Sequence, residues 1–314
     1  MLTMIRRRVF LAGGFAFFAL IGRVSAQQPA IIASGVRIGR GRMLIVQDDA
    51  SGRIVALDSS TYRASNPTTS ADVVVVGSYC GLRVLAPIFT DGVKAVIATD
   101  GGIGKDEAGI SGLKHGETIG VPVAAIAAMS AETSNGRSTL LGEISRANAQ
   151  ARALGVEPGM PAYEAAALLA KAPVGRPIPT ERGGEAGPVV VEETPRGRIW
   201  ASPGTTAITE QIPNDIVCSG ANSSRVMSDG VLRMAAKGAI ANDAGIAMNN
   251  TAVEGVMLLT EHGIPAASVS TMTARLGEGL STWNDGIISV ANVVAAELGV
   301  KVGMTAKEAA RLML

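Results

Sequence analysis

Asp100 and Asp243 are the residues of this sequence best placed to carry chemistry. Each directly follows an apolar stretch that otherwise lacks charge, and each is followed two residues later by a glycine, Gly102 or Gly245. A carboxylate in such a place can act as a general base or hold the amine of a substrate. The alternative is structural, because an aspartate after a strand also fixes glycine turns. The sequence leaves both interpretations open.

Ser78 and Cys80 are the candidate nucleophiles or oxyanion contacts. Both lie in the small-residue segment Gly77-Ser-Tyr-Cys-Gly81, which follows another apolar stretch. A cysteine attacks as its thiolate, and no neighbouring base marks Cys80 for that role. Cys218 lies inside an apolar stretch, so we expect a plain core residue. A disulfide between the two cysteines is chemically permitted outside the cytoplasm, but nothing in the sequence supports it.

The candidate substrate-binding residues lie in polar loops after these apolar stretches. They are Gly102, Lys105, Asp106, Glu132, Asn222, Asn242, Gly245, Asn249 and Arg275. The glycines at 101, 102 and 104 lack the spacing of a dinucleotide or P-loop motif, so we expect carboxylate binding there, helped by Lys105. Glu132 and Arg275 carry opposite charges at matching places. They suit a cleft for a small polar or zwitterionic molecule, and the alternative is a surface position or an intramolecular ion pair.

No metal or cofactor is predicted. His115 and His262 form neither an H-x-x-x-H nor an H-E-x-x-H pattern, so each is expected at the surface or at a helix end. A divalent-cation site that uses Asp100 and Asp106 is the alternative, but the sequence does not indicate enough further oxygen ligands to complete it.

The chain matches itself over most of its length. Asp72–Thr139 aligns with Asp215–Thr282 at an offset of 143 with 18 identities in 68 positions. Ala147–Ala170 aligns with Ala291–Leu314 with 13 identities in 24. A period of about 145 residues is too long for a solenoid, so it predicts a duplicated domain. We therefore expect a first α/β repeat over 27–170, a Pro/Gly-rich linker over 171–187 and a second α/β repeat over 188–314.

Each repeat alternates strands and helices. Two segments, Met43–Gln47 and Ile54–Leu57, predict a hairpin or two short extended segments. The expected buried strands are Val73–Val76, Val93–Thr99 and Val121–Ala128, then Ile216–Ser219, Gly238–Asn242 and Pro265–Thr271. Four helices are expected in the first repeat. The first extends to Phe89, and the others lie over Asp106–Ile119, near Leu140–Leu154 and over Pro161–Ala170. Thr305 and Glu308 predict a capping box for the last helix of the second repeat.

The predicted fold is therefore α/β, with two tandem copies of a βαβαβα unit, a parallel sheet and pseudo-twofold symmetry. Ligands of parallel sheets bind at the carboxyl ends of the strands, which is where the candidate residues fall.

Residues 1–26 have the pattern of a twin-arginine signal peptide. Arg6-Arg-Arg-Val-Phe-Leu11 is followed by an apolar stretch and by Val24-Ser-Ala26 before a predicted cut. This predicts the twin-arginine export machinery as a partner and a periplasmic or secreted location. The alternative is an uncleaved anchor, but the apolar stretch is shorter than the roughly 20 residues of a membrane span. We expect no stable membrane anchor after cleavage.

Composition narrows the function further. Without the leader the chain has 24 basic and 27 acidic residues, a formal balance of −3. A chain with this charge balance has no strong positive electrostatic field that would attract nucleic acid. Phe89 is the one phenylalanine left, so the core must be aliphatic, which suits helices on a parallel sheet.

The leading hypothesis is an exported hydrolase acting on an amide, lactam or related bond of a small polar metabolite. The alternative is a periplasmic solute-binding protein for organic acids or amino compounds, since the duplicated plan resembles the two-lobed solute-binding proteins in architecture alone. The third hypothesis is a purely structural or assembly role. A monomer and a homo-oligomer both stay open.

Overall fold

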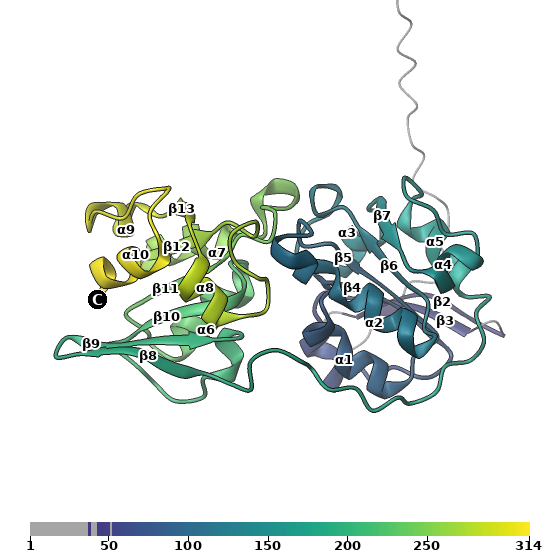
Figure 1. Cartoon of the computed structure of the whole chain (residues 1–314). Helices are drawn as coiled ribbons and strands as arrows, with labels where there is room; N and C mark the ends of the chain where they lie inside the picture. Colours follow the sequence, from purple (N-terminus) through teal and green to yellow (C-terminus); the bar gives the residue numbers. More distant parts are fainter. Residues whose placement is uncertain (1–36, 39–42, 51) are drawn as a thin grey trace, which may run out of the picture. The chain divides into compact units, whose positions relative to one another are not determined.

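Two sheets, each covered by helices on both faces, make up the protein. The structure is a computed structural model that describes residues 37–38, 43–50 and 52–314 (Figure 1). The described residues belong to one compact unit, Gly35–Leu314. The predicted signal peptide lies outside them. We refer to residues 43–170 as the first half and to residues 188–314 as the second half.

The first sheet has seven strands in chain order. They are β1 (Arg37–Ile38), β2 (Met43–Asp49), β3 (Gly52–Leu57), β4 (Asp72–Tyr79), β5 (Ala95–Thr99), β6 (Val123–Ile126) and β7 (Ile144–Ala147). The strands from β3 to β6 are parallel, whereas β1, β2 and β7 pair antiparallel with their neighbours. The hairpin predicted for the start of this half is confirmed as β2 and β3.

Helices cover both faces of this sheet because successive side chains of its strands point to opposite sides. Val74 and Val76 of β4 pack with α1 (Leu82–Asp91) and α2 (Ser111–Ile119). Val73 and Val75 pack on the other face, with α3 (Gly136–Leu140), α4 (Ala149–Ala153) and α5 (Ala162–Leu169). The continuous valine run therefore marks a strand buried on both faces, as expected.

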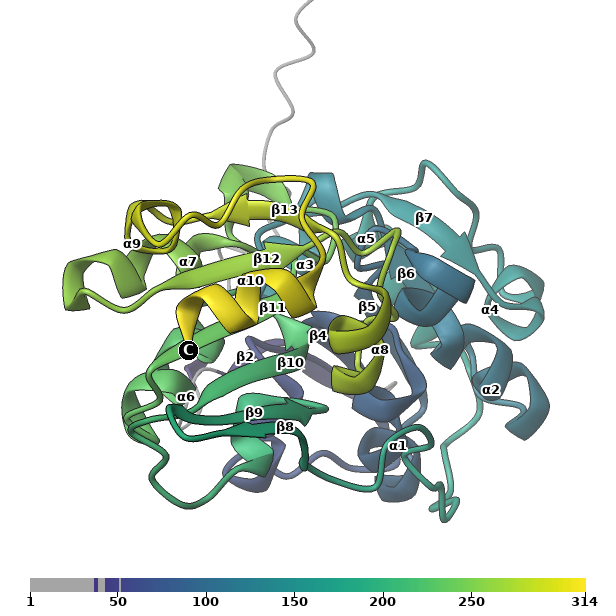
Figure 2. The ribbon, with the colours of Figure 1, turned by 60° about the vertical axis from the view of Figure 1, so that its left-hand side comes forward.

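The second sheet repeats this plan with six strands in chain order (Figure 2). They are β8 (Val189–Thr194), β9 (Gly197–Ser202), β10 (Ile216–Asn222), β11 (Gly238–Asn242), β12 (Ala266–Val269) and β13 (Ile288–Ala291). The strands from β9 to β12 are parallel, and the edge strands β8 and β13 are antiparallel.

Five helices cover the second sheet. On one face lie α6 (Arg225–Arg233) and α7 (Glu254–Leu258), and on the other lie α8 (Gly279–Asp285), α9 (Val293–Glu297) and α10 (Ala306–Met313). The predicted capping box at the start of α10 is confirmed. Short 3-10 helices complete the chain: η2 (Ser60–Ala64), η3 (Lys105–Ile110), η4 (Ala128–Ser130), η5 (Thr205–Ala207), η6 (Met248–Asn250) and η7 (Leu259–His262). None of the described helices is both long and apolar enough to cross a membrane.

Matching positions of the two halves make matching contacts. Arg53 pairs with Asp72 at 2.6 Å, and Arg198 pairs with Asp215 at 2.9 Å. Each pair ties together the first two parallel strands of its sheet. The α/β fold with two similar units is therefore shown, while the gene duplication behind it stays a prediction from the sequence.

The predicted parallel arrangement is confirmed for the central strands of both sheets, and their edge strands are antiparallel. One detail of the predicted fold is wrong. The helix expected near Leu140–Leu154 is instead the end of α3, then β7, then α4. Gly142 follows the end of α3 at a crowded place, where a Cβ would lie 2.7 Å from the Ile126 side chain, and Asn148 starts α4 by accepting a hydrogen bond from Ala151 N. A four-residue strand such as β7 gives too short a pattern to detect.

The helix expected over Asp106–Ile119 also begins later than predicted. Asp106 and Glu107 have φ angles of +53° and +55°, so η3 is irregular, and regular helix begins at Ser111. Small polar residues tolerate this left-handed conformation better than most.

Residues 171–187 contain no helix or strand, as expected for a linker, and form the long loop between α5 and β8 in Figure 1. The loop is held against the first half. Gly175 N donates to Ser70 O at 2.7 Å, and Ile178 N donates to Phe89 O at 3.2 Å.

Candidate functional site

Asp100 and Asp243 hold the turns that follow β5 and β11. One oxygen of Asp100 accepts hydrogen bonds from Gly102 N and Ala128 N, both at 2.9 Å, and the other accepts from Ser145 Oγ at 2.9 Å. The side chain is buried, and its two oxygens already have three donors. Such a carboxylate is poorly suited to take a proton from a substrate.

Asp243 makes the matching contacts in the second half. Its Oδ1 accepts from Gly245 N at 3.1 Å and from Thr271 N at 2.9 Å, and the residue is 5% exposed. In both halves the aspartate thus ties the loop after one strand to the loop after the next. The geometry supports the structural interpretation of this pair.

The two glycines beside these aspartates touch each other. A Cβ added to Gly102 would lie 2.8 Å from the Cα of Gly245, and a Cβ on Gly245 would lie 2.8 Å from the Cα of Gly102. Their φ angles are +73° and +74°. Equivalent points of the two halves therefore meet, which requires glycine on both sides.

Most of the other predicted binding residues join the two halves around this contact. Arg275 Nη2 lies 2.6 Å from Asp106 Oδ2, and Asn249 Nδ2 donates to Glu132 Oε1 at 3.0 Å. These two pairs occupy matching positions. Glu132 and Arg275 therefore contact the opposite half instead of facing each other across a cleft, as the intramolecular alternative predicted.

Lys105 and Asn242 are also committed to protein contacts. Lys105 Nζ pairs with Asp285 at 2.9 Å. The buried amide of Asn242 accepts from Ala244 N at 2.9 Å and donates to Ala274 O at 3.0 Å. The amide of Asn242 is thus used within the protein, and the charge of Lys105 is balanced by Asp285.

Cys80 and Cys218 are both buried, and neither forms a disulfide. Burial raises the pKa of the Cys80 thiol far above its usual value and that of Cys218 to about 12. Cys218 is a core residue, as expected. Cys80 is a neutral thiol packed against aliphatic side chains, which argues against a nucleophilic role.

The histidines differ from each other. His262 is exposed at the end of η7, as predicted. His115 is only partly exposed on α2, with its ring 5.6 Å from that of Phe89 and its Nε2 buried without a hydrogen-bond partner among the described residues.

A cavity of about 490 Å³ opens at the carboxyl ends of β4 and β10. We call it the arginine cleft. Residues from η2, β4 and α1 of the first half line it together with residues from η5, β10 and α6 of the second half and Arg182 of the linker. Its lining is rich in hydroxyl groups, from Ser59, Ser60, Thr61, Ser78, Ser134, Thr205 and Thr206.

Three arginines line the cleft, and none of the described residues that line it is acidic. Arg63 pairs with Asp91 outside the cleft, and its Nε is buried without a partner in the described chain. Arg83 donates to the neutral carbonyls of Gly183 and Glu185 at 3.0 and 2.8 Å. The lining thus presents guanidinium groups and no carboxylate, with Asp91 balancing the charge of Arg63 and the Glu185 carboxylate within electrostatic range of Arg83, and guanidinium groups favour an anion.

Ser78 and Asn222 are the two predicted site residues that line this cleft. Ser78 Oγ accepts from Ser60 N at 3.1 Å, and Asn222 Oδ1 accepts from Ser224 Oγ at 2.7 Å. The three arginines were missed, because they come from a 3-10 helix, a helix start and the linker. The position of Arg83 directly after the first-strand loop was the one available signal.

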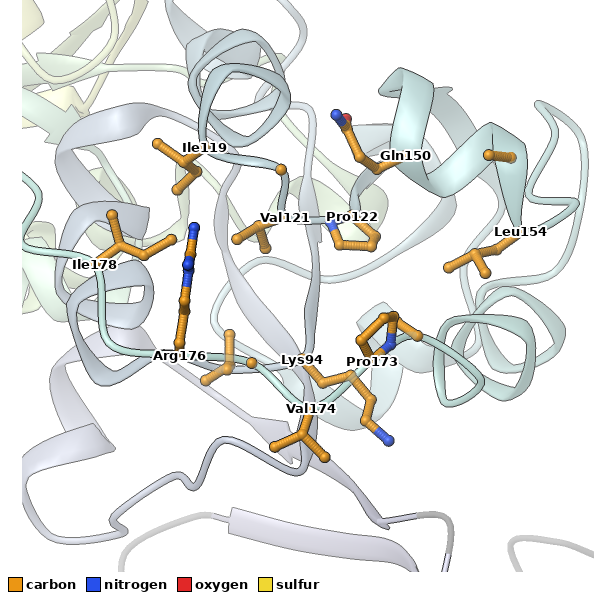
Figure 3. Close-up of a pocket in the computed structure, with 15 residues that line it drawn as sticks. Lys94, Ile119, Val121, Pro122, Gln150, Leu154, Pro173, Val174, Arg176 and Ile178 are labelled. Atoms are coloured by element: carbon orange, nitrogen blue, oxygen red, sulfur yellow. The ribbon is translucent and has the colours of Figure 1, made fainter.

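A second cavity, of about 410 Å³, lies at the amino ends of β5 and β6 (Figure 3). Its lining is mostly apolar, and the linker forms one wall, where Arg176 rises between Ile178 and Val121. Lys94 also lines it, but its Nζ donates to Ala170 O, as Lys237 Nζ does to Leu314 O at the matching place of the second half. This lysine contact is structural, and the cavity lies at the end of the sheet where ligands seldom bind.

Comparison with known proteins adds no family, because no protein-family model, curated protein or solved structure matches this chain. Within residues 43–50 and 52–314, no group of three or more His, Cys, Asp or Glu side chains is placed to hold a metal ion.

Proposed function

We propose that this protein is an exported binding protein that holds a small polar anion in the arginine cleft. The observation that carries the proposal is the convergence of Arg63, Arg83 and Arg182 with seven serine and threonine side chains on a cavity without an acidic lining residue. Guanidinium groups bind carboxylate and phosphate oxygens through paired hydrogen bonds. A volume of about 490 Å³ suits a metabolite-sized ligand.

The hydrolase expected from the sequence is the second candidate. Ser78 favours it, because this residue lines the cleft at the carboxyl end of β4. A serine needs a base to become a nucleophile, and the two aspartates proposed for that role bind backbone amides instead. The geometry therefore supports binding better than hydrolysis.

Titration calorimetry on residues 27–314, which contain the whole compact unit, tests the binding proposal. The panel pairs organic acids with their neutral amides, and Arg182→Gln is compared with Arg196→Gln. Arg196 is a matched control because it is exposed on the turn between β8 and β9, and does not line the cleft.

We expect an acid to bind while its amide does not, and we expect Arg182→Gln to raise the Kd about tenfold, since a hydrogen bond to a charged group contributes about 1.5–3 kcal/mol. Arg196→Gln should leave the Kd unchanged. Equal binding of acid and amide would contradict the proposal. Mass spectrometry of the same mixtures would instead reveal an enzyme if an amide were consumed.

The export part of the proposal is tested separately. Replacing Arg7 and Arg8 by lysine should leave the protein in the cytoplasm, because the pair of arginines before Val9-Phe10-Leu11 is the feature that the twin-arginine machinery recognises. Cell fractionation measures this, and normal export of the double variant would contradict the predicted route.

A further inference from the structure

We infer that the arginine cleft binds its ligand in one direction, with a single anionic end on the first half and an uncharged, hydroxylated end on the second half. The ligand class is therefore a small polyhydroxylated molecule with one anionic group, at one end. This inference rests on the proposed function and deepens it. The cleft is built from matching elements of the two halves, so a difference between its walls is a difference in side chains and not in architecture.

The cations of the cleft have no counterparts across it. Arg83 is the second residue of α1, and the second residue of α6 is Val226. Arg63 is the fourth residue of η2, whereas Ile208, which directly follows η5, stands in the matching place and is buried. Arg182, the third cation, belongs to the linker.

The wall of the second half is polar but uncharged. Thr206 and Asn222 line it beside the apolar Val226 and Met227. Arg233 is a cation of the same half, but it donates to the carbonyls of Thr205 and Ile208 and does not line the cleft. A hydroxyl group of the ligand could hydrogen bond to Thr206 or Asn222, and neither partner would carry a charge.

A ligand with two anionic ends would be penalised. One end could reach the arginines, but the other would lose water against Val226 and Met227 without gaining a cation. Desolvating an unpaired carboxylate is costly, so the cleft should bind a ligand with one anionic end more tightly than a ligand of equal length with an anion at both ends.

Four six-carbon probes test the direction by calorimetry on residues 27–314: gluconate, glucarate, glucitol and glucose 6-phosphate. We expect gluconate to bind at least tenfold more tightly than both glucarate, which has two carboxylates, and glucitol, which has none. Glucose 6-phosphate tests whether the anionic group is a phosphate or a carboxylate. If it binds more tightly than gluconate, the ligand still has one anionic end, and that end is a phosphate.

A gain of function gives the second test. Val226→Arg places a cation on the second wall, so the preference for gluconate over glucarate should fall at least threefold. Val302→Arg is the control, since Val302 is 67% exposed and does not line the cleft. Thermal unfolding checks that both variants fold.

The outcomes separate the two proposals. Binding of glucarate as tight as that of gluconate by the unmodified protein would overturn the direction while leaving anion binding intact. An unchanged preference in a folded Val226→Arg variant would overturn it as well. Equal binding of glucitol and gluconate would overturn anion binding itself. No binding of any of these anions would overturn the polyhydroxylated ligand class, while the panel of organic acids and amides decides anion binding.

Discussion

Replacing Gly102 by alanine tests whether the two halves meet as the structure shows. The new Cβ would lie 2.8 Å from Gly245 Cα and 3.1 Å from Gly245 N. Both opposing atoms are backbone, so neither can rotate away. The residue would also have to keep a φ of +73°, which L-residues other than glycine rarely adopt.

The conformational and steric costs can be separated with a control. Gly120 has a φ of +76°, but nothing lies within 4 Å of its added Cβ. Gly120→Ala should therefore cost only the left-handed conformation, about 1–2 kcal/mol of unfolding free energy. Gly102→Ala should cost a further ~1–3 kcal/mol for forced overlap, which is a large part of the 5–15 kcal/mol typical of a domain.

Chemical denaturation of the two variants and the unmodified protein measures these differences. Gly245→Ala should match Gly102→Ala, and the double variant should lose less than the sum, because the first substitution has already separated the loops. If Gly102→Ala lost no more stability than Gly120→Ala, the space beside Gly102 would be open. The contact between the halves would then be refuted.

Two further predictions concern buried groups. Because burial raises the pKa of Cys80 and of Cys218, a thiol reagent at pH 8 should modify neither in the folded protein and both after denaturation; rapid labelling of native Cys80 would show an accessible thiolate. Burial alone would raise the pKa of Asp215, but hydrogen bonds from Trp200 and Arg198 lower it. Its contribution to stability is therefore complete above the pKa of the unfolded carboxyl group and is lost as the pH falls through the lower folded value. Asp215→Asn should cost about 2 kcal/mol at pH 7 and less at pH 3, and a cost that does not change with pH would contradict this.

The fold could be predicted to the extent that it leaves a local pattern in the sequence. The run Val73–Val76 is buried on both faces and lies within β4, which continues through Gly77 and Ser78 to Tyr79. The edge strand β7 left no such pattern, because only Ile144 and Ala147 of its four residues are buried. An edge strand such as β7 has a neighbouring strand on one side only. Fewer of its side chains are buried, so its sequence is less constrained and harder to recognise.

The candidate site was predicted less well, for a different physical reason. The strand-end rule points to the edge of the sheets where the proposed cleft lies, and Ser78 and Asn222 line that cleft. The residues repeated in both halves, such as Asp100 and Asp243, were ranked highest, and these hold the loops between the halves together. Arg182 could not be found at all, because the path of an irregular linker depends on tertiary contacts such as the bonds from Arg83 to its carbonyls.

These outcomes suggest a general way to interpret a chain that matches itself. A residue that matches between the two halves satisfies a demand that both halves share, and in this protein the turn aspartates and the touching glycines do so where the halves meet. A ligand that lies between two matching units but is not itself symmetric makes different demands on each. Positions where the copies differ at the strand ends, such as Arg83 against Val226, are therefore better candidates for binding than positions where they agree.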